Sequence, residues 1–275
     1  MKNTRTLQLM IVVCSVLLFV LLFIANKKPE KKVEESPPTN GTSQLVADVK
    51  VYVDTIIAVL PEKAKKDYEV LVKKATDTTG INTLIDFFNK KKMPLVAAYY
   101  FQKKAELINS AKAWYDAGNR YFYAVSFANI KNVTQSLYKS AFFAYTQALA
   151  KNPDYTEAKI QLASCYVEST TDPMKGIGML KEVERADSAN TQVQMVLGAF
   201  AVKSSQFDKA EARYKKVIRI KPQYLEAYLF LADVYEKKGE KTKTIETLEK
   251  YVELTPDKEA KEQVKKYIQQ LKINV

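Results

Sequence analysis

The sequence of 275 residues contains no histidine, and its only cysteines are Cys14 and Cys165. Without histidine the chain lacks the commonest general base and the commonest metal ligand. Two thiols are too few for a four-cysteine zinc site or for a disulfide framework. Glycine (seven residues) and proline (nine residues) are also scarce, which disfavours a β-rich or collagen-like chain. We therefore expect no metal and no cofactor.

The usual catalytic motifs are missing as well. The sequence has no G-x-x-x-x-G-K-[ST] phosphate-binding loop and no G-x-S-x-G nucleophile elbow. Gly176 and Gly178 form a G-x-G, but Lys181 stands where a dinucleotide-binding loop needs its third glycine. Cys165 falls in a predicted helix and has no histidine to activate it, so we interpret it as a packed thiol. We expect neither catalysis nor a small-molecule substrate, and an unrecognised enzyme is the last of three hypotheses.

Positive charge is abundant, but it is mostly lysine. Lysine and arginine number 43 against 31 acidic residues, a net charge of +12. The lysines are dispersed among glutamates, as in EKKGEKTKTIETLEK (236–250), which is typical of solvated helix faces. Because arginine is the residue that best reads bases and phosphates, its scarcity predicts that nucleic acid is not a partner.

One long apolar run, Leu9–Ala25, lies near the N-terminus. As a helix it reaches roughly 26 Å, the short end of what crosses a hydrocarbon core. The alternative is a cleaved signal peptide, but the run exceeds the usual apolar region and bulky Phe23 precedes the candidate cleavage site. We expect residues 1–26 to form a short tail and an uncleaved transmembrane anchor, so that the membrane is one partner. Residues 27–44, with mixed charge and several prolines, are predicted to form a flexible linker.

The charges that flank the anchor give conflicting indications of its orientation. Lys2 and Arg5 precede the apolar run and a lysine cluster follows it, which favours a body facing the cytoplasm. A very short N-terminal tail, however, usually stays in the cytoplasm, so that the rest of the chain is translocated across the membrane. We expect an exported body, with the cytoplasm-facing body as the alternative.

From residue 45 onward the chain has the apolar periodicity of amphipathic helices, which predicts an all-α body. Residues 45–77 are predicted to form an N-terminal helical segment, although Val49–Asp54 also alternates like a short strand. Further along, the body repeats itself: Thr191–Tyr224 and Leu225–Lys258 align without a gap at a period of about 34 residues. The matching positions are Leu197, Gly198, Ala210, Tyr214, Val217 and Pro222 in the first segment, and Leu231, Ala232, Thr244, Leu248, Tyr251 and Pro256 in the second.

Earlier segments match with departures. Residues 156–190 contain one extra residue, and residues 111–155 contain extra residues around Asn129–Gln135. We interpret this insertion as a longer first helix followed by an extended loop. Residues 78–110 are a degenerate unit, and residues 259–275 are predicted to form a helix that caps the last open face.

These segments resemble the tetratricopeptide repeat. Trp114, Ala117, Gly118 and Tyr121 are similar to its W-x2-L-G-x2-Y signature. The resemblance implies an α-solenoid of about four to five helix-turn-helix repeats with a C-terminal capping helix, preceded here by one transmembrane helix. With that anchor, the chain is similar to bacterial single-span tetratricopeptide proteins, including the repeat modules of cytochrome c assembly factors.

In this repeat family a partner binds on the concave side, which the first helix of each repeat lines. Such a groove suits an apolar peptide anchor with polar neighbours that fix its register. Alternatively, some of these side chains simply pack against the long loop or the N-terminal helices. Carried over position by position, the resemblance implies a groove lined by Tyr115, Asn119, Phe122, Tyr123, Ile160, Ser164, Val167, Met195, Ala199, Val202, Leu229 and Asp233.

We therefore expect a non-catalytic, membrane-anchored scaffold or adaptor that binds a protein or peptide in this groove. It would assemble or position a complex of the membrane or envelope, at the cell inner membrane and with a periplasmic body. The alternative is a client-binding maturation factor, such as a tetratricopeptide protein of cytochrome c assembly.

Overall fold

The computed structural model describes residues 42–170 and 172–273. The predicted anchor, Leu9–Ala25, and most of the predicted linker lie outside these ranges. Within them the fold is all-α, and no helix there is long and apolar enough to cross a bilayer. The thirteen described helices are α2 (Thr42–Ala58), α3 (Glu62–Lys74), α4 (Thr78–Lys90), α5 (Pro94–Ile108), α6 (Ala111–Val125), α7 (Lys131–Lys151), α8 (Thr156–Glu168), α9 (Pro173–Ala186), α10 (Thr191–Lys203), α11 (Phe207–Ile220), α12 (Leu225–Lys237), α13 (Lys241–Leu254) and α14 (Lys258–Ile273).

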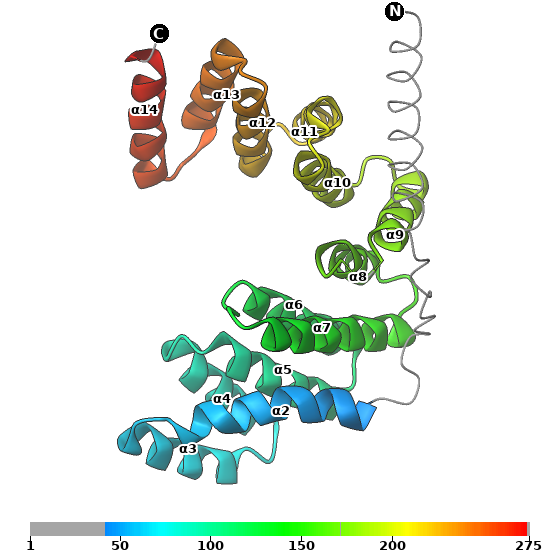
Figure 1. The fold of residues 1–275 in the computed structure, drawn as a ribbon, viewed down its shortest axis with the longest axis vertical. Coiled ribbons are helices and arrows are strands. Elements are labelled where there is room, and N and C mark those ends of the chain that lie inside the picture. Colours follow the sequence, from blue (N-terminus) through cyan, green and yellow to red (C-terminus); the bar gives the residue numbers. More distant parts are fainter. Residues whose placement is uncertain (1–41, 171, 274–275) are drawn as a thin grey trace, which may run out of the picture. The chain divides into compact units, whose positions relative to one another are not determined.

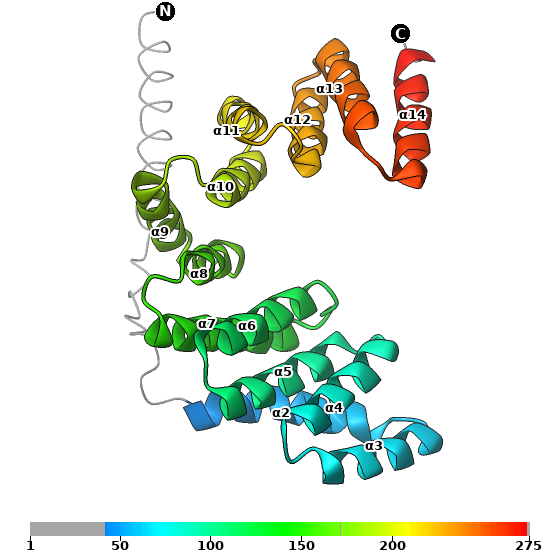
Figure 2. The same ribbon diagram turned by 180° about the vertical axis from the view of Figure 1, so that it is seen from behind.

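Successive helices pack as neighbours joined by short turns (Figures 1 and 2). The pairs α4/α5, α6/α7, α8/α9, α10/α11 and α12/α13 each pack together, and the second helix of each pair also contacts the first helix of the next. This arrangement confirms the predicted all-α fold of paired helices. Val49–Asp54, whose alternation also allowed a strand, lies within helix α2.

Glycines allow the two helices of a pair to approach closely. A Cβ atom added at Gly118 would lie 2.6 Å from the ring of Tyr145, and one added at Gly198 would lie 2.6 Å from the ring of Tyr214. Both distances are far below van der Waals contact, so a larger residue requires the tyrosine ring to move. In both pairs the first helix supplies the glycine and the second helix supplies the ring.

The hydrophobic core changes character along the chain. One continuous cluster of buried side chains runs from Val49 on α2 to Cys165 on α8, and it includes Phe88, Tyr121 and Tyr145. Beyond α8 the buried residues are divided among three smaller clusters. The last of them joins Leu248 on α13 to Ile268 on α14, so α14 covers the apolar face of the final pair.

The insertion around Asn129–Gln135 has a structure that differs from the expected one. Helix α6 has 15 residues, whereas α7 has 21, against 14 in α9, α11 and α13. The prediction of an extended loop was therefore wrong, because most of the extra residues lengthen the second helix at its N-terminal end. Buried Ser136 and Leu137 hold this extension against the core.

The turns inside four helix pairs share a left-handed residue two positions after the end of the first helix. These residues are Lys92, Thr170, Ser205 and Gly239, with φ values of 55°, 59°, 57° and 74°. At three of them the next N–H bonds back to a carbonyl five residues earlier, as Gln206 N does to Ala201 O at 2.8 Å. This is the Schellman pattern, which satisfies the last carbonyls of a helix. The connection from α6 to α7 lacks such a residue and continues α6 with i→i+3 bonds instead.

Candidate partner-binding surface

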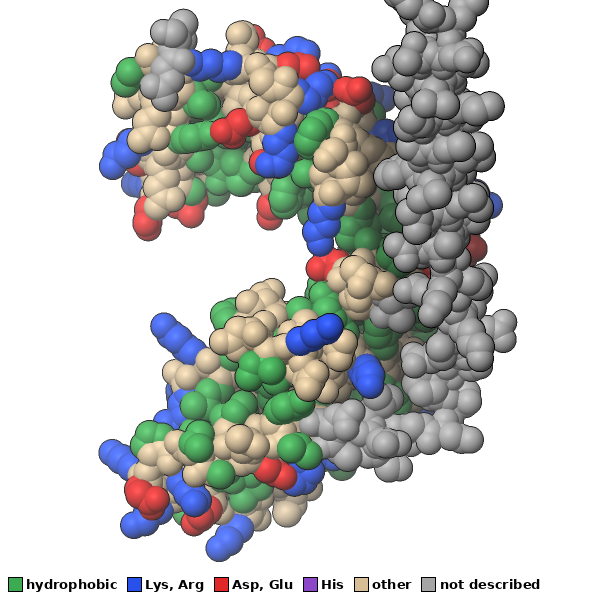
Figure 3. Space-filling view, viewed as in Figure 1, with side chains coloured by type: hydrophobic (Ala, Val, Ile, Leu, Met, Phe, Trp, Pro, Cys, Tyr) green, Lys and Arg blue, Asp and Glu red, His purple; other side chains and the backbone are tan. Residues whose placement is uncertain are grey.

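The residues assigned to the groove lie on α6, α8, α10 and α12, the first helices of four successive pairs. We call this set of residues the A-face. Figure 3 shows the Ser43–Val275 unit hollowed between the part around α6 and the part around α12. Helices α8 and α10 lie on the side of this hollow, with their partners α9 and α11 behind them (Figures 1 and 2).

On α6, ring contacts and one hydrogen bond hold the A-face side chains in place. Tyr115 is half-buried, and its ring centroid lies 5.0 Å from that of Tyr155 and 6.1 Å from that of Tyr145. The hydroxyl of Tyr145 donates to Oδ1 of Asn119 at 2.8 Å. Because the Asn119 carbonyl is engaged from the core side, its orientation on the surface is fixed.

The end of α6 carries two further aromatic residues with different environments. Phe122 is half-buried, and its ring lies 6.1 Å from that of Tyr138 on α7. Tyr123 is 55% exposed and contacts Phe127, beyond the end of α6, with the ring centroids 5.0 Å apart. Phe122 therefore helps to pack the pair together, whereas Tyr123 belongs to an exposed apolar tip.

Two predicted groove residues on α8 are inaccessible to a partner in this structure. Ile160 is fully buried between successive pairs, in one cluster with Leu180 on α9 and Val193 on α10. Ser164 is 4% exposed and donates its hydroxyl to the carbonyl of Ile160 at 3.0 Å. Ile160 is enclosed at the junction of the α8/α9 and α10/α11 pairs, and the buried Ser164 hydroxyl is bonded within α8, so we remove both from the A-face. Half-buried Val167 packs against the same cluster and stays at its edge.

The residues of α10 lie at the junction with the following pair. Met195 and Val202 are half-buried and pack against the cluster that contains Tyr214 and Leu231. Ala199, between them in sequence, is half-buried as well. Next to this row, the Lys203 ammonium lies 3.7 Å from the carboxylate of Glu168, which links the ends of α10 and α8. The α10 part of the A-face thus combines partly exposed apolar side chains with an ion pair.

Helix α12 presents the most exposed apolar residues of the A-face region. Leu229 is 37% exposed and Phe230 is 46% exposed, and the Phe230 ring stacks on Tyr214 at 5.6 Å. Asp233, one turn further along, pairs with Lys237 at 2.9 Å. Phe230 was not predicted, because the repeat pattern places its position outside the groove.

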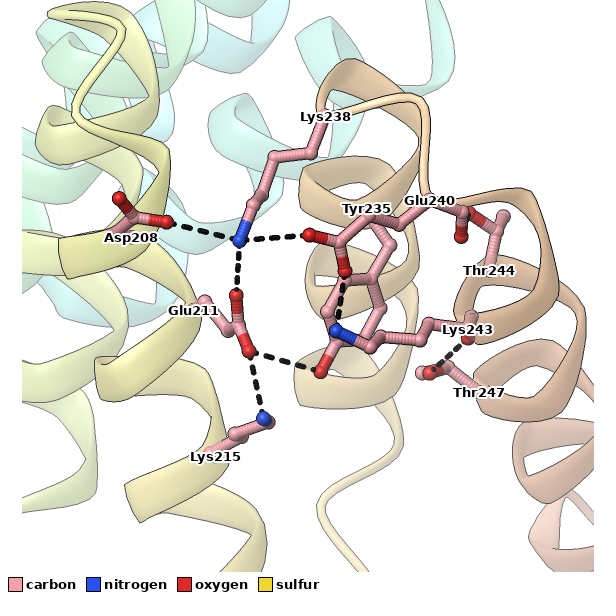
Figure 4. Close-up of polar contacts among 9 residues, drawn as sticks. All are labelled: Asp208, Glu211, Lys215, Tyr235, Lys238, Glu240, Lys243, Thr244 and Thr247. Atoms are coloured by element: carbon pink, nitrogen blue, oxygen red, sulfur yellow. Dashed lines mark hydrogen bonds and ion pairs between the residues drawn. The ribbon is translucent and has the colours of Figure 1, made fainter.

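A network of charged side chains fixes α12 between its neighbours (Figure 4). The Lys238 ammonium contacts Asp208 at 2.9 Å and Glu211 at 2.6 Å, both on α11, and Glu240 at 3.1 Å, just before α13. Glu211 also accepts hydrogen bonds from Lys215 at 2.7 Å and from the Tyr235 hydroxyl at 3.3 Å. Partial burial raises the pKa of Glu211, but the bonds from Lys215 and Lys238 outweigh it and hold the pKa at about 2.

A second polar bridge connects the two preceding pairs. Arg213 on α11 donates to Glu184 on α9 at 2.9 Å and to Gln194 on α10 at 2.8 Å. Gln194 is 1% exposed and donates in turn to Glu184 at 2.8 Å. All three groups are thereby satisfied, so the bridge fixes the angle at which α10 presents its part of the A-face.

Other surface features escaped the sequence interpretation. A cavity of about 600 Å³ lies among α2, α3, α4 and α5, where the hydroxyls of Tyr68 and Tyr100 are 3.0 Å apart. Exposed Phe127 and Ile130 lie in the α6–α7 connection. The adjacent aromatic residues Tyr99 and Tyr100 are visible in the sequence and could have indicated the cavity. The repeat pattern of residues 78–110 is too degenerate, however, to show which way these side chains point.

The described residues offer contact surfaces rather than reactive groups. Among them, no three His, Cys, Asp or Glu side chains lie where they could hold a metal ion. Cys165 is buried, and burial raises the pKa of its thiol well above the usual value, which disfavours the nucleophilic thiolate. What the A-face can supply is hydrophobic contact flanked by a few fixed polar groups.

Comparison with known proteins identifies the repeat in the C-terminal part of the chain and the fold of the described helices. Residues 201–265 match the sequence model of the tetratricopeptide repeat. A tetratricopeptide repeat protein from Parabacteroides merdae ATCC 43184 is 13% identical with a TM-score of 0.54, over 84% of this chain and 86% of that one. TTC0263, a thermophilic tetratricopeptide repeat protein of Thermus thermophilus, is 17% identical with a TM-score of 0.52, over 71% and 98%. No curated protein matches the chain significantly.

At these identities the likeness to the two structures shows the fold alone. The chain has the fold of tetratricopeptide repeat proteins, and its C-terminal repeats also carry the sequence pattern of that family.

Proposed function

We propose that this protein is a non-catalytic adaptor whose A-face binds a protein or peptide partner. The observation that carries the proposal is a row of partly exposed apolar side chains on successive first helices: Tyr115 on α6, Val167 on α8, Met195 on α10 and Leu229 on α12. Large apolar side chains that border solvent beside fixed polar groups are typical of peptide-binding surfaces.

The polar neighbours would supply the register of the bound segment. Asn119 is oriented by Tyr145, and the Lys203–Glu168 and Asp233–Lys237 pairs lie along the same set of helices. Such partly exposed pairs add little affinity, but they penalise a partner whose charges are misplaced. We therefore infer that affinity comes from the apolar row and specificity from these pairs.

We further propose that Leu9–Ala25 anchors the adaptor in the cell inner membrane, with its body in the periplasm, where it assembles or positions a membrane or envelope complex. The support is the length and composition of this run in the sequence. A client-binding maturation factor, such as one of cytochrome c assembly, is the alternative for the same surface.

Photocrosslinking in cells tests the A-face. A photoreactive amino acid at Tyr115, Met195 or Leu229 should capture a partner, because these side chains border solvent on α6, α10 and α12. The same probe at exposed Ala212 on α11 or Glu246 on α13 serves as the control, since these residues lie on second helices. Stable stoichiometric products favour the scaffold, and transient unfolded precursors favour the maturation factor. No capture from any of the three A-face positions would refute the proposal, as would capture from the control positions alone.

Protease accessibility tests the proposed location. A protease added to intact spheroplasts should degrade the body if it lies in the periplasm. Full protection, with degradation only after lysis, would show instead that the body faces the cytoplasm.

A further inference from the structure

The α4–α5 turn and the α6–α7 connection lie at the same edge of the helix stack (Figures 1 and 2). Helices α5 and α6 pack together and are joined by only Asn109 and Ser110, so the start of α5 lies beside the end of α6. Met93, Val125 and Ala128 accordingly pack against one cluster. We call the exposed residues here the loop edge: Lys90, Lys91, Lys92, Tyr123, Phe127, Ile130 and Lys131.

The apolar part of the loop edge projects into solvent. Tyr123, Phe127 and Ile130 are 55%, 59% and 60% exposed. Their backbone is ordered, because the i→i+3 bonds from Phe127 N to Ala124 O at 3.1 Å and from Ala128 N to Val125 O at 3.0 Å continue α6. More than half of each side chain is exposed to solvent, and all three lie at or just beyond the end of α6. They therefore form an exposed apolar tip.

The charged part of the loop edge is positive, and exposed Asp86, one helical turn before Lys90, is the acidic residue nearest to its lysines in the sequence. From Ala117 to Pro153 the sequence contains no aspartate or glutamate. Lys90, Lys91, Lys92 and Lys131 are exposed, and none of them forms an ion pair within the part of the chain that the structure describes. Lys91 instead lies over the Phe87 ring, with its ammonium 4.7 Å from the centroid. Four lysines without an acidic partner thus surround three exposed apolar side chains.

We propose that the loop edge binds the surface of a bilayer that contains anionic lipids. Aromatic and aliphatic side chains on a protruding tip enter the region between headgroups and acyl chains, while flanking lysines pair with anionic headgroups. An acidic peptide is the other ligand that the charge would suit. Its apolar residues, however, would need a concave receptor, and the loop edge offers an exposed tip.

The lysines set the size of the expected effect. Each lysine near an anionic membrane surface strengthens partitioning about fivefold, so three of them together contribute about 100-fold. The effect also weakens as salt is added, because it depends on charges at the water interface.

A fluorescent probe at the tip of the full-length chain tests this proposal. In a Cys14→Ser background, Phe127→Cys provides an accessible thiol, since Cys165 is buried. Labelled with an environment-sensitive nitrobenzoxadiazole dye, the protein is reconstituted through its N-terminal apolar run into vesicles of phosphatidylcholine alone or with added phosphatidylglycerol, so that the anchor is common to both and the dye reports the loop edge. We expect a blue shift and quenching by acyl-chain spin labels only in the anionic vesicles. The same dye on Thr242→Cys, exposed at the start of α13, should report water in both.

Charge variants complete the test. Replacing Lys91, Lys92 and Lys131 with glutamine should lower the ratio of membrane-embedded to water-exposed dye in the anionic vesicles about 100-fold. The matched variant, with Lys258, Lys261 and Lys266 of α14 replaced by glutamine, removes the same charge elsewhere and should behave as the parent protein. Equal dye spectra in neutral and anionic vesicles would overturn the proposal, as would equal effects of the two lysine variants. Capture of an acidic protein by a crosslinker at Phe127, with no lipid-dependent shift, would assign the loop edge to a protein instead.

The outcome is separable from that for the A-face. The probes at Met195 and Leu229 lie on α10 and α12, so they report partner capture whether or not the loop edge meets a membrane.

Discussion

Most buried residues of helices α4–α7 belong to one large aromatic core, beside a second, alanine-rich cluster around Trp114, whereas α10–α14 bury their apolar residues in smaller clusters. In the first region Phe88 stacks on Tyr100 at 5.7 Å, and the buried hydroxyl of Tyr121 bonds to Gln102 at 2.6 Å. In the second region polar bridges around Lys238 and Arg213 connect the clusters. The two regions thus use the same paired architecture with different contacts between neighbouring pairs.

The difference bears on how stability is distributed along a repeat protein. In such a protein, stability is roughly the sum of each repeat and its interfaces. A continuous core couples neighbouring pairs strongly, so α4–α7 should unfold as a unit. Polar bridges couple neighbouring helix pairs more weakly, because water solvates the same charged groups when the bridge is broken. The C-terminal pairs, which carry Met195 and Leu229, are therefore the more adaptable part of the A-face.

The largest expected effect comes from overpacking the helix crossings. Gly118→Leu should lower the free energy of unfolding by about 3 kcal/mol or more, and Gly198→Leu by about 1–3 kcal/mol. Tyr145 is enclosed by the continuous core, whereas the Tyr214 ring is covered by Phe230, which is 46% exposed and can move. Urea unfolding monitored by circular dichroism measures both values.

A control at a third glycine separates crowding from helix propensity. Nothing lies within 4 Å of a Cβ atom added at Gly178, so Gly178→Ala should raise the stability by about 0.5–1 kcal/mol. If the two leucine variants lose equal stability, the proposed contrast between the regions is wrong.

The next effect tests buried hydrogen bonds in the two regions. Tyr121→Phe leaves the carbonyl of buried Gln102 without its donor and should cost about 1–3 kcal/mol. Tyr235→Phe should cost less, because Glu211 keeps its two lysine donors. Tyr123→Phe, at an exposed hydroxyl, is the control and should lie within about 0.5 kcal/mol of the parent. Thermal melting checks the order, and a larger loss for Tyr235→Phe would reverse it.

A smaller effect is the pH dependence of the C-terminal region. The pKa of Glu211 is lowered from 4.5 to about 2, so the charged carboxylate stabilises the fold above pH 4.5. This contribution is lost progressively as the pH falls from about 4.5 to about 2. Glu211→Gln should therefore lower the unfolding midpoint at neutral pH and flatten its decline in acid. Glu246→Gln, which removes one exposed carboxylate of α13, is the control for the change in net charge.

The smallest expected effect on stability is at the A-face itself. Leu229→Ala should change the free energy of unfolding by about 0.5 kcal/mol, since the side chain is 37% exposed. It should nevertheless weaken crosslinking from Met195, because it removes part of the apolar row. Ile220→Ala has a matched exposure of 36% at the end of α11 and should leave crosslinking intact. Equal crosslinking in the two variants would show that the partner does not use α12.

The paired-helix fold could be predicted because each repeat makes its contacts locally. Gly118 and Gly198 were identified from the repeat pattern, and each meets a tyrosine of its own pair. Such contacts depend on spacing within about 34 residues, which a single sequence displays. The insertion could not be predicted in the same way, because asparagine, valine and threonine near its start are poor helix formers. There, tertiary packing of Leu137 against the core overrides local propensity.

The candidate surface was harder to predict than the fold. The repeat pattern identifies which positions of a first helix face the groove, but not how tightly the next pair closes over them. Ile160 is long and aliphatic, so the junction with α10 encloses it. Phe127 and Ile130 lie in a connection that the repeat pattern does not cover, and only their exposure in the structure reveals them.

The left-handed turn residues have a consequence for engineering. The same turn is made with Lys92, Thr170, Ser205 and Gly239, and glycine alone adopts that backbone without a steric penalty. The β-branched Thr170 carries the greatest penalty of the four. Exchanging Thr170 and Ser205 for glycine would relieve that penalty without touching the A-face or the loop edge. Glycine at these two positions is therefore a way to raise the thermal stability of the protein without changing the residues proposed to bind a partner.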